Sequence, residues 1–269
     1  MRLLTILLTL GLLATGPVAA QDSEGIDPEA LIDRILKVYH DQRAKLSTVT
    51  LDAVYAEGEM KDDEGFVEKE RFEKKIYLKY LEDTVLYHEQ YVAYYKDDEL
   101  QEEKKLREAA RDRQKKKRDR KAYDISYPML KPFFPETRAT YTITYDGTAE
   151  EPSEGFLCHV FTVKANEEVD TLLEGQWYFD SETFHLARVE FAPARLVKKT
   201  MFKLNKLDMT LLQAPAAEGI WLPRRFELVG KGKAAFLFGV SFAGQEYYRN
   251  PQINVEIPDS LFVEETNDD

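Results

Sequence analysis

The chain has 269 residues, with 37 Lys and Arg against 49 Asp and Glu, so its formal net charge is -12 at pH 7. This acidity argues against general attraction to nucleic acid or to anionic membranes. Cys158 is the only cysteine, which excludes an internal disulfide and leaves the core to stabilise the fold by itself.

The first twenty residues are typical of a secretory signal. Met1 and Arg2 precede an apolar stretch at residues 3–15, and small residues follow as far as Ala20. The stretch is shorter than the roughly 20 apolar residues that span a bilayer. We therefore expect residues 1–20 to be a cleavable signal peptide and residues 21–269 to form a single exported domain.

A helix pattern opens this predicted domain. Asp27 offers a side-chain cap, Pro28 has a preset backbone angle, and Glu29 places a carboxylate near the positive end of the helix dipole. Apolar residues then recur at helical spacing, at Leu31, Ile32, Ile35, Leu36, Val38 and Tyr39. The spacing predicts one amphipathic helix over 28–46.

From Thr48 onward the apolar period changes to two, which is typical of strands. A long hairpin is predicted around a turn at 62–65, followed by a strand over 84–95. Further strand patterns cover 141–145, 156–163, the hairpin 175–191, 201–212, 220–229 and 233–243. About ten strands with hairpin-length connections predict an α+β protein that is mainly antiparallel β.

The segment 97–121 breaks the strand pattern. Acidic residues come first, and the stretch from Lys104 to Lys121 then holds eleven Lys and Arg against three acids. The order of charges fits a helix dipole, so a charged helical insertion is predicted. It is either a solvated face or a surface for anionic lipid head groups, a partner's phosphates or the acidic residues of another protein.

An apolar segment with three prolines, YPMLKPFFPE, follows at 127–136. Prolines at this density exclude a central strand, so we expect a loop or short helices that cover another part of the molecule. The side chains available for such a lid are Met129, Leu130, Phe133 and Phe134.

Catalytic motifs are weakly represented. Cys158 and His159 are adjacent on a predicted strand, where neighbouring side chains point to opposite faces and cannot form a dyad. His185 is interpreted as a packing or interface residue, and the acidic run at 62–65 as a solvated turn instead of a calcium loop. No enzyme, metal site or cofactor is predicted, and a secreted hydrolase using carboxylates remains a less favoured alternative.

Several strands have apolar residues on both faces. Trp177, Tyr178 and Phe179 are consecutive, and 156–163 is apolar on both sides apart from His159 and Thr162. An antiparallel sheet with two apolar faces needs a cover on each face. Two solutions stay open: the sheet curls and side chains fill its interior, or the inner face receives a ligand.

Three segments resemble the LolA/LolB-like periplasmic lipoprotein-carrier superfamily. They are GQWYFDSETFHLARVEF at 175–191, GIWLPRRFEL at 219–228 and NPQINVEIPDSLF at 250–262. The first contains a glycine and an aromatic strand, an Asp-x-x-Thr turn and an Arg-x-Glu strand, at Gly175, Trp177, Asp180, Thr183, Arg188 and Glu190. The charged segment 97–121 departs from this resemblance.

The resemblance implies a strongly bent, unclosed β-barrel with an apolar cavity for acyl chains, in a periplasmic carrier of lipid or lipoprotein. We expect a monomer that exchanges its cargo with a membrane-bound donor or acceptor protein. The predicted cavity residues are Trp177, Phe179, Phe236, Phe238 and Phe242, under a lid of Met129, Leu130, Phe133 and Phe134. The alternative on the same fold is a sensor or interaction module that works through the helix at 97–121.

Overall fold

The computed structural model describes residues 26–61, 64–82, 84–117, 126–196, 198–199, 202–234 and 238–262. The predicted signal peptide at 1–20 lies outside these ranges. The described helical elements are α1 (Pro28–Lys45), α2 (Glu103–Lys117), α3 (Ser126–Leu130), η1 (Lys131–Phe133), α4 (Pro135–Arg138) and η2 (Asp259–Phe262).

The strands form one antiparallel sheet. Their bounds are β1 (Thr48–Lys61), β2 (Gly65–Tyr80), β3 (Val85–Lys96), β4 (Glu99–Leu100), β5 (Tyr141–Glu150), β6 (Leu157–Ala165), β7 (Leu173–Asp180), β8 (Leu186–Pro193), β9 (Lys198–Lys199), β10 (Phe202–Ala217), β11 (Ile220–Ala234) and β12 (Phe238–Ile253). Eleven of them follow the order β4-β3-β2-β1-β12-β11-β10-β8-β7-β6-β5, and β9 pairs with β10.

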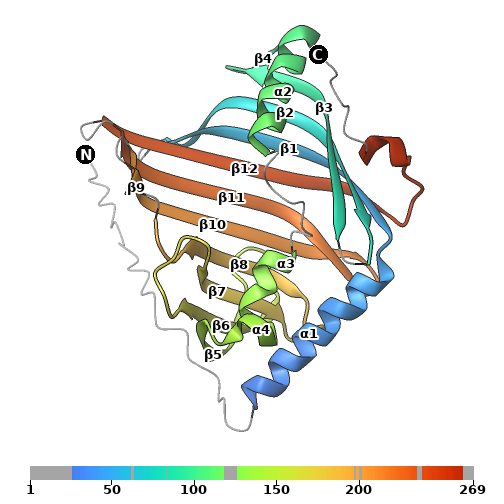
Figure 1. Ribbon diagram of the computed structural model, residues 1–269, viewed down its shortest axis with the longest axis vertical. Coiled ribbons are helices and arrows are strands. Elements are labelled where there is room, and N and C mark those ends of the chain that lie inside the picture. Colours follow the sequence, from blue (N-terminus) through green and yellow to red (C-terminus); the bar gives the residue numbers. More distant parts are fainter. Residues whose placement is uncertain are drawn as a thin grey trace, which may run out of the picture.

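The sheet is open, because β4 and β5 stand at opposite ends of this order. The predicted fold class, an unclosed and mainly antiparallel barrel-like sheet with an N-terminal helix and a helical insertion, is therefore confirmed. Figure 1 shows α2, α3 and α4 in front of the same face of the sheet, with α1 along one margin. We call this face the inner face.

One row of paired residues crosses the inner face through ten strands. Residues that pair directly in antiparallel strands share a face, so the register places all ten on the same side. From β3 to β5 the row reads Tyr94, Phe72, Tyr55, Glu246, Phe226, Leu211, Val189, Trp177, Phe161 and Tyr145. Aromatic and aliphatic side chains dominate the row, so the inner face is apolar over most of its width.

Helix α1 begins and ends where the sequence predicts. The Asp27 carboxylate accepts a hydrogen bond from the Glu29 amide at 3.0 Å, and Pro28 occupies the first turn. Four apolar residues of one stripe are buried, at Leu31, Ile32, Ile35 and Leu36. Gln42, one turn before the end, exchanges two hydrogen bonds with the backbone of Trp221, and this fixes the helix to β11.

The motif at 175–191, which carries the sequence resemblance, has a structural role in β7 and β8. A Cβ at Gly175 would come within 1.9 Å of the Glu190 carbonyl oxygen, so only glycine fits there. Asp180 Oδ1 accepts hydrogen bonds from the amide and the hydroxyl of Thr183, which closes the turn. Arg188 donates to the buried Glu151 carboxylate at 2.9 Å and ties this hairpin to the loop after β5.

Candidate functional site

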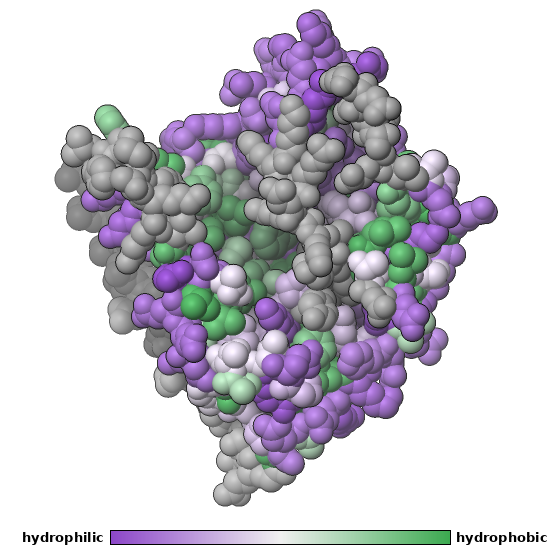
Figure 2. Space-filling model, viewed as in Figure 1, coloured by the Kyte–Doolittle hydropathy of each residue, from purple (hydrophilic) through white to green (hydrophobic). Residues whose placement is uncertain are grey.

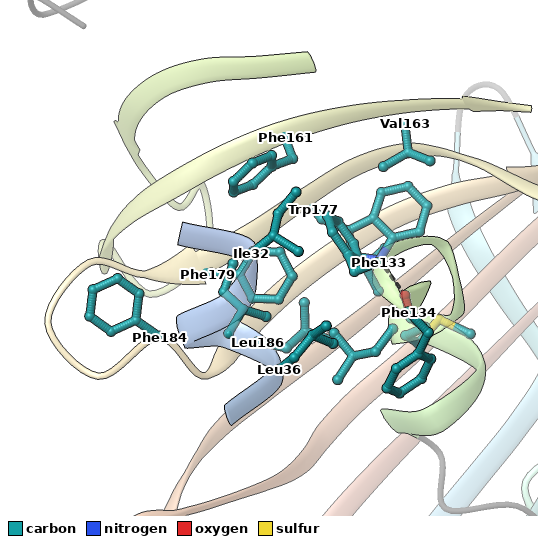
Figure 3. Packing of buried hydrophobic residues seen from close by; sticks show 14 of the residues in the cluster. Ile32, Leu36, Phe133, Phe134, Phe161, Val163, Trp177, Phe179, Phe184 and Leu186 are labelled. Atoms are coloured by element: carbon teal, nitrogen blue, oxygen red, sulfur yellow. Dashed lines mark hydrogen bonds between the residues drawn. The ribbon is translucent and has the colours of Figure 1, made fainter. Parts of the chain in front are cut away.

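Aromatic side chains fill the β6–β8 part of the inner face. A cavity of about 190 Å³ remains beside them, lined by Tyr145 of β5, Phe161 of β6 and Ile32 of α1 among others. Phe133 of η1 is fully buried, and its ring lies edge-on to Phe161, Trp177 and Phe179 at centroid distances of 5.3–6.1 Å. The indole Nε1–H of Trp177 donates to the Met129 carbonyl oxygen at 2.7 Å (Figure 3). This hydrogen bond satisfies the polar atom of a buried indole and fixes the proline-rich segment onto the sheet.

The predicted lid residues all belong to this packed region, which we call the aromatic core. Met129, Leu130, Phe133 and Phe134 are buried in one cluster with the α1 stripe, Trp177 and Phe179. Figure 3 shows these side chains converging from α1, from the α3–η1 segment and from β6 and β7. The structure thus places Trp177 and Phe179 directly beneath the predicted lid, and neither side chain reaches solvent.

A hollow lies beside the aromatic core, over β10, β11 and β12. Figure 2 shows apolar side chains gathered there, between the charged surface of α2 and the α3–α4 segment. The register continues the inner face through partly exposed residues, which are Leu207, Met209, Phe226, Leu228, Val240 and Phe242. We call this lining the trough; it is a strip of apolar sheet that the helices leave partly uncovered.

Two glycines shape the trough floor. The Phe242 ring lies across Gly230, where an added Cβ would come within 2.1 Å of the ring. At Gly244 an added Cβ would come within 3.2 Å of the Tyr55 hydroxyl and 3.4 Å of Leu228. Larger residues at either position would fill this space, so the glycines keep the floor low and let an aromatic ring lie flat on it.

The remaining predicted cavity residues are dispersed. Phe242 lines the trough, whereas Phe238 is 68% exposed at the start of β12. Phe236 lies outside the described residues. The structure therefore divides the predicted set, with Trp177 and Phe179 in the aromatic core, Phe242 in the trough and Phe238 at its outer end.

A polar cluster occupies the inner face of β2, β3 and β12. Lys74 lies between two carboxylates: it pairs with Glu89 and sits 2.6 Å from Glu246. All three side chains are at most 13% exposed. Burial opposes the charge of Lys74, but the two carboxylates outweigh this effect and raise its pKa.

Tyrosines surround these charges. Tyr87 and Tyr91 both donate to Glu89, the latter at 3.0 Å. Burial is the main cause that raises the pKa of both hydroxyls, and the Glu89 charge adds to it. The tyrosines therefore stay protonated and act as donors, which a buried carboxylate requires.

Helix α2 covers this end through Arg113. The guanidinium carbon lies 4.1 Å from the Phe72 ring centroid and 5.0 Å from that of Tyr55. One guanidinium nitrogen is 2.6 Å from Glu57 and 4.0 Å from Glu70. Desolvation opposes the charge of Arg113, yet Glu57 outweighs it and raises the pKa. Leu106, Ala109 and Ala110 are half-buried on the same side of the helix.

Cys158 and His159 do not form a catalytic pair. The thiol is fully buried among Val160, Tyr178 and Trp221, and burial raises its pKa to about 12, so it stays protonated. The His159 ring instead contacts the Tyr145 hydroxyl at 3.0 Å and stacks on Phe184. A buried neutral thiol is a poor nucleophile.

Within the described ranges, the structure offers no candidate metal site and no candidate membrane-spanning helix. No group of three or more His, Cys, Asp or Glu side chains within them is arranged to hold a metal ion. Over the same residues, no helix combines the length and the apolar content that crossing a bilayer requires.

Sequence reasoning missed the polar cluster and the docking of Arg113. The apolar face of β2 runs through Phe72, Ile76 and Leu78, and Lys74 occupies the position missing from that series. A lysine at an inward position of an otherwise apolar strand face signals a buried ion pair. For Arg113 the signal is weaker, because it is one of many cations on a charged helix.

Comparisons with known proteins concern the fold. No family model matches the chain, and no curated protein matches its sequence. A solved DUF1329 family protein from Desulfovibrio piger is similar at 12% identity, covering 89% of this chain and 98% of its own, with a TM-score of 0.47.

Two further solved structures are similar at lower scores. One is described as an outer membrane lipoprotein-sorting protein domain from Vibrio parahaemolyticus, with 8% identity and a TM-score of 0.38; the other is a LolA superfamily protein from Nitrosomonas europaea, with 9% identity and a TM-score of 0.35. Each match covers 86% of this chain and 97% of the other.

Proposed function

We propose that this protein is a non-enzymatic periplasmic binder or carrier of lipid or lipoprotein acyl chains, and that the chains lie in the trough. The single observation that carries the proposal is the unequal cover of one apolar sheet face. The aromatic core closes the β6–β8 part, whereas Leu228 and Phe242 remain partly exposed on β11 and β12. An apolar concave surface of this kind is suited to a hydrocarbon guest.

A carrier must release its acyl chain, so the chain should be only partly buried in the binding site. An acyl chain of about sixteen carbons, at roughly 0.8 kcal/mol per CH₂, would gain at most about 12 kcal/mol on full burial. Ordering of the chain lowers this value. An open trough covers one side of the chain and lowers the gain further, which favours release to an acceptor.

The segment 126–138 is proposed as the lid. In the described state its side chains fill the aromatic core, and the Trp177–Met129 hydrogen bond holds it down. Trp177 and Phe179 become binding residues only when this segment moves away. The proposal therefore has a shallow site, the trough, and a deeper site beneath the lid.

The test is mass spectrometry of organic extracts from mature protein purified without detergent. A stoichiometric lipid is expected in the wild type. Leu228→Asp should remove it, because a carboxylate in the trough would have to be desolvated by the acyl chain. Val92→Asp is the matched control, since Val92 is 60% exposed on β3. Absence of any lipid from the wild type, with added fatty acid also failing to bind, would overturn the proposal.

A second candidate is the sensor or interaction module, and one observation favours it. The outward side of α2 is basic and exposed, at Lys104, Lys105, Arg107 and Arg111. Replacing Lys104, Lys105 and Arg107 by Glu leaves Arg113 in place. A carrier should keep its lipid in this variant, whereas a sensor should lose its partner in pull-down from periplasmic extract.

A further inference from the structure

The polar end of the inner face contains a cation site that the protein fills with its own arginine. Arg113 of α2 makes specific contacts to the sheet. Two rings, from Tyr55 and Phe72, face its guanidinium, and Glu57 and Glu70 lie beside it. Aromatic faces with adjacent carboxylates are the surroundings that bind organic cations.

This box is contiguous with the trough. Tyr55 belongs to both, because its ring contacts Arg113 and its hydroxyl lies beside the Gly244 and Leu228 positions. Glu57 pairs with Gly244 across β1 and β12, so the carboxylate is one register position from the trough floor. A molecule with its tail along β11 and β12 would therefore bring its head group to the box.

The charges around the box favour a cation after Arg113 leaves. Lys74 is already shared by Glu89 and Glu246, and Lys96 lies 3.7 Å from Glu70 at the rim. Among the described residues, the contact that Glu57 would then keep is the hydrogen bond from the Tyr55 hydroxyl, 3.3 Å away. Without Arg113 the box would hold two carboxylates beside two aromatic faces, and both features attract a cation and repel an anion.

The rest of α2 is lightly attached. Over Glu103–Gln114, the part of α2 whose side chains the structure describes, Leu106, Ala109 and Ala110 join Arg113 as half-buried residues, and the charged side chains on the other sides lie in water. Arg107, for example, pairs with Glu103 within the helix, and both side chains are 75% exposed. A helix held in this way buries little apolar surface of its own, so the main apolar surface exposed when it leaves the sheet is the Phe72 ring beneath Arg113.

We propose that the box formed by Tyr55, Phe72, Glu57 and Glu70 binds the cationic head group, ammonium or guanidinium, of an amphiphile whose tail lies in the trough, in competition with Arg113. This inference rests on the proposed function and adds the chemical class of the ligand. Arg113 acts as a tethered competitor, so the apparent affinity of a cationic ligand is reduced by the fraction of time that Arg113 occupies the box.

The experiment compares three amphiphiles with the same twelve-carbon tail, below their micelle concentrations: dodecyltrimethylammonium, dodecyl maltoside and dodecyl sulfate. Isothermal titration calorimetry is performed on wild type, Arg113→Ala and, as a control, Arg107→Ala. Removal of Arg113 should tighten binding of the cationic amphiphile about tenfold and leave the neutral one within about twofold. Arg107→Ala should behave as wild type, and Glu57→Gln added to Arg113→Ala should reverse the gain.

A second measurement uses the unmodified protein. Hydrogen exchange of the α2 amides should accelerate when the cationic amphiphile is added, because its head group displaces Arg113, and should stay unchanged with the sulfate. Equal tightening of all three amphiphiles by Arg113→Ala, or no change in cationic affinity, would overturn the head-group inference while leaving the trough intact. If none of the three binds wild type or variant, the proposed function itself fails.

Discussion

The two ends of the inner face use similar side chains for different purposes. Both ends carry aromatic rings on paired strands, and both are covered by a helical segment. At β6–β8 the cover contributes Phe133 and Phe134, so ring packs on ring in a buried cluster. At β1–β3 the cover contributes Arg113, which meets rings and carboxylates. The nature of the covering side chain, apolar or charged, decides whether an aromatic sheet face becomes core or site.

The comparison predicts that the aromatic core dominates stability, and Phe133→Ala tests this most strongly. Phe133 is fully buried against three aromatic rings, so its loss should reduce the free energy of unfolding by about 4 kcal/mol. Phe238→Ala, at a 68% exposed phenylalanine, should change it by less than about 0.5 kcal/mol. Urea unfolding followed by tryptophan fluorescence measures both. Equal losses in the two variants would refute the assignment of a packed and an open region.

The next largest effect is expected in the polar cluster, from Lys74→Met. The variant leaves Glu89 and Glu246 buried without their shared cation, which should cost about 3 kcal/mol. Lys75→Met is the matched control: the neighbouring lysine is 42% exposed and 3.6 Å from an exposed Asp52, so less than about 0.5 kcal/mol is expected. If Lys74→Met unfolds at the same urea concentration as wild type, the cluster is not a buried ionic network.

Much of the fold could be predicted from local sequence patterns. Helix α1 is predicted at 28–46 and runs over Pro28–Lys45, because its cap, its proline and its apolar stripe are all local signals. The long hairpin and the strand at Val85–Lys96 also follow from period-two alternation. The strand predicted at 233–243 is wrong as one element: β11 ends at Ala234, and its antiparallel partner β12 begins at Phe238 and continues to Ile253, beyond the last apolar alternation.

The contacts between distant parts of the chain could not be predicted from local sequence patterns. Ala187, Val189 and Phe191 alternate along the sequence as one strand face would, but a bulge between β7 and β8 puts Ala187 on the other face from Val189 and Phe191. The contact of Phe242 with Gly230 depends on strand register, which hydrophobicity alone does not reveal. The division of aromatics between core and trough depends on which helix covers which strands, and no local signal encodes that choice.

Glu151→Gln, which removes the carboxylate that binds Arg188, should lower the free energy of unfolding by a smaller and pH-dependent amount. The buried Glu151 carboxylate loses solvation, but hydrogen bonds from the Glu154 and Ser153 amides and from Arg188 outweigh this and lower its pKa below the ordinary value of 4.5. Its contribution to stability is therefore complete above about pH 4.5 and fades as the pH falls through the lower folded-state pKa. At pH 7 the variant should lose about 2 kcal/mol.

The measurement is urea unfolding of wild type and Glu151→Gln between pH 7 and pH 3.5. The difference between them should stay constant down to about pH 5 and then shrink. Glu150→Gln, one residue earlier and exposed, serves as control and should show little difference at any pH. A difference for Glu151→Gln that persists unchanged to pH 3.5 would show that its carboxylate charge is not the stabilising feature.

The smallest effect on stability should come from Gly230→Ala in the trough. This substitution should weaken ligand binding more than folding, in contrast to substitutions in the aromatic core. The new methyl group would overlap the Phe242 ring, and because that ring is only half-buried it can swing into the trough, at a cost below about 1 kcal/mol. The displaced ring would then narrow the space for a tail, and the dissociation constant for dodecyl maltoside should rise about fivefold. Phe242→Ala added to Gly230→Ala should restore affinity, since the ring is the obstacle. If affinity falls but the second substitution does not recover it, the Phe242 ring is not what shapes the trough floor.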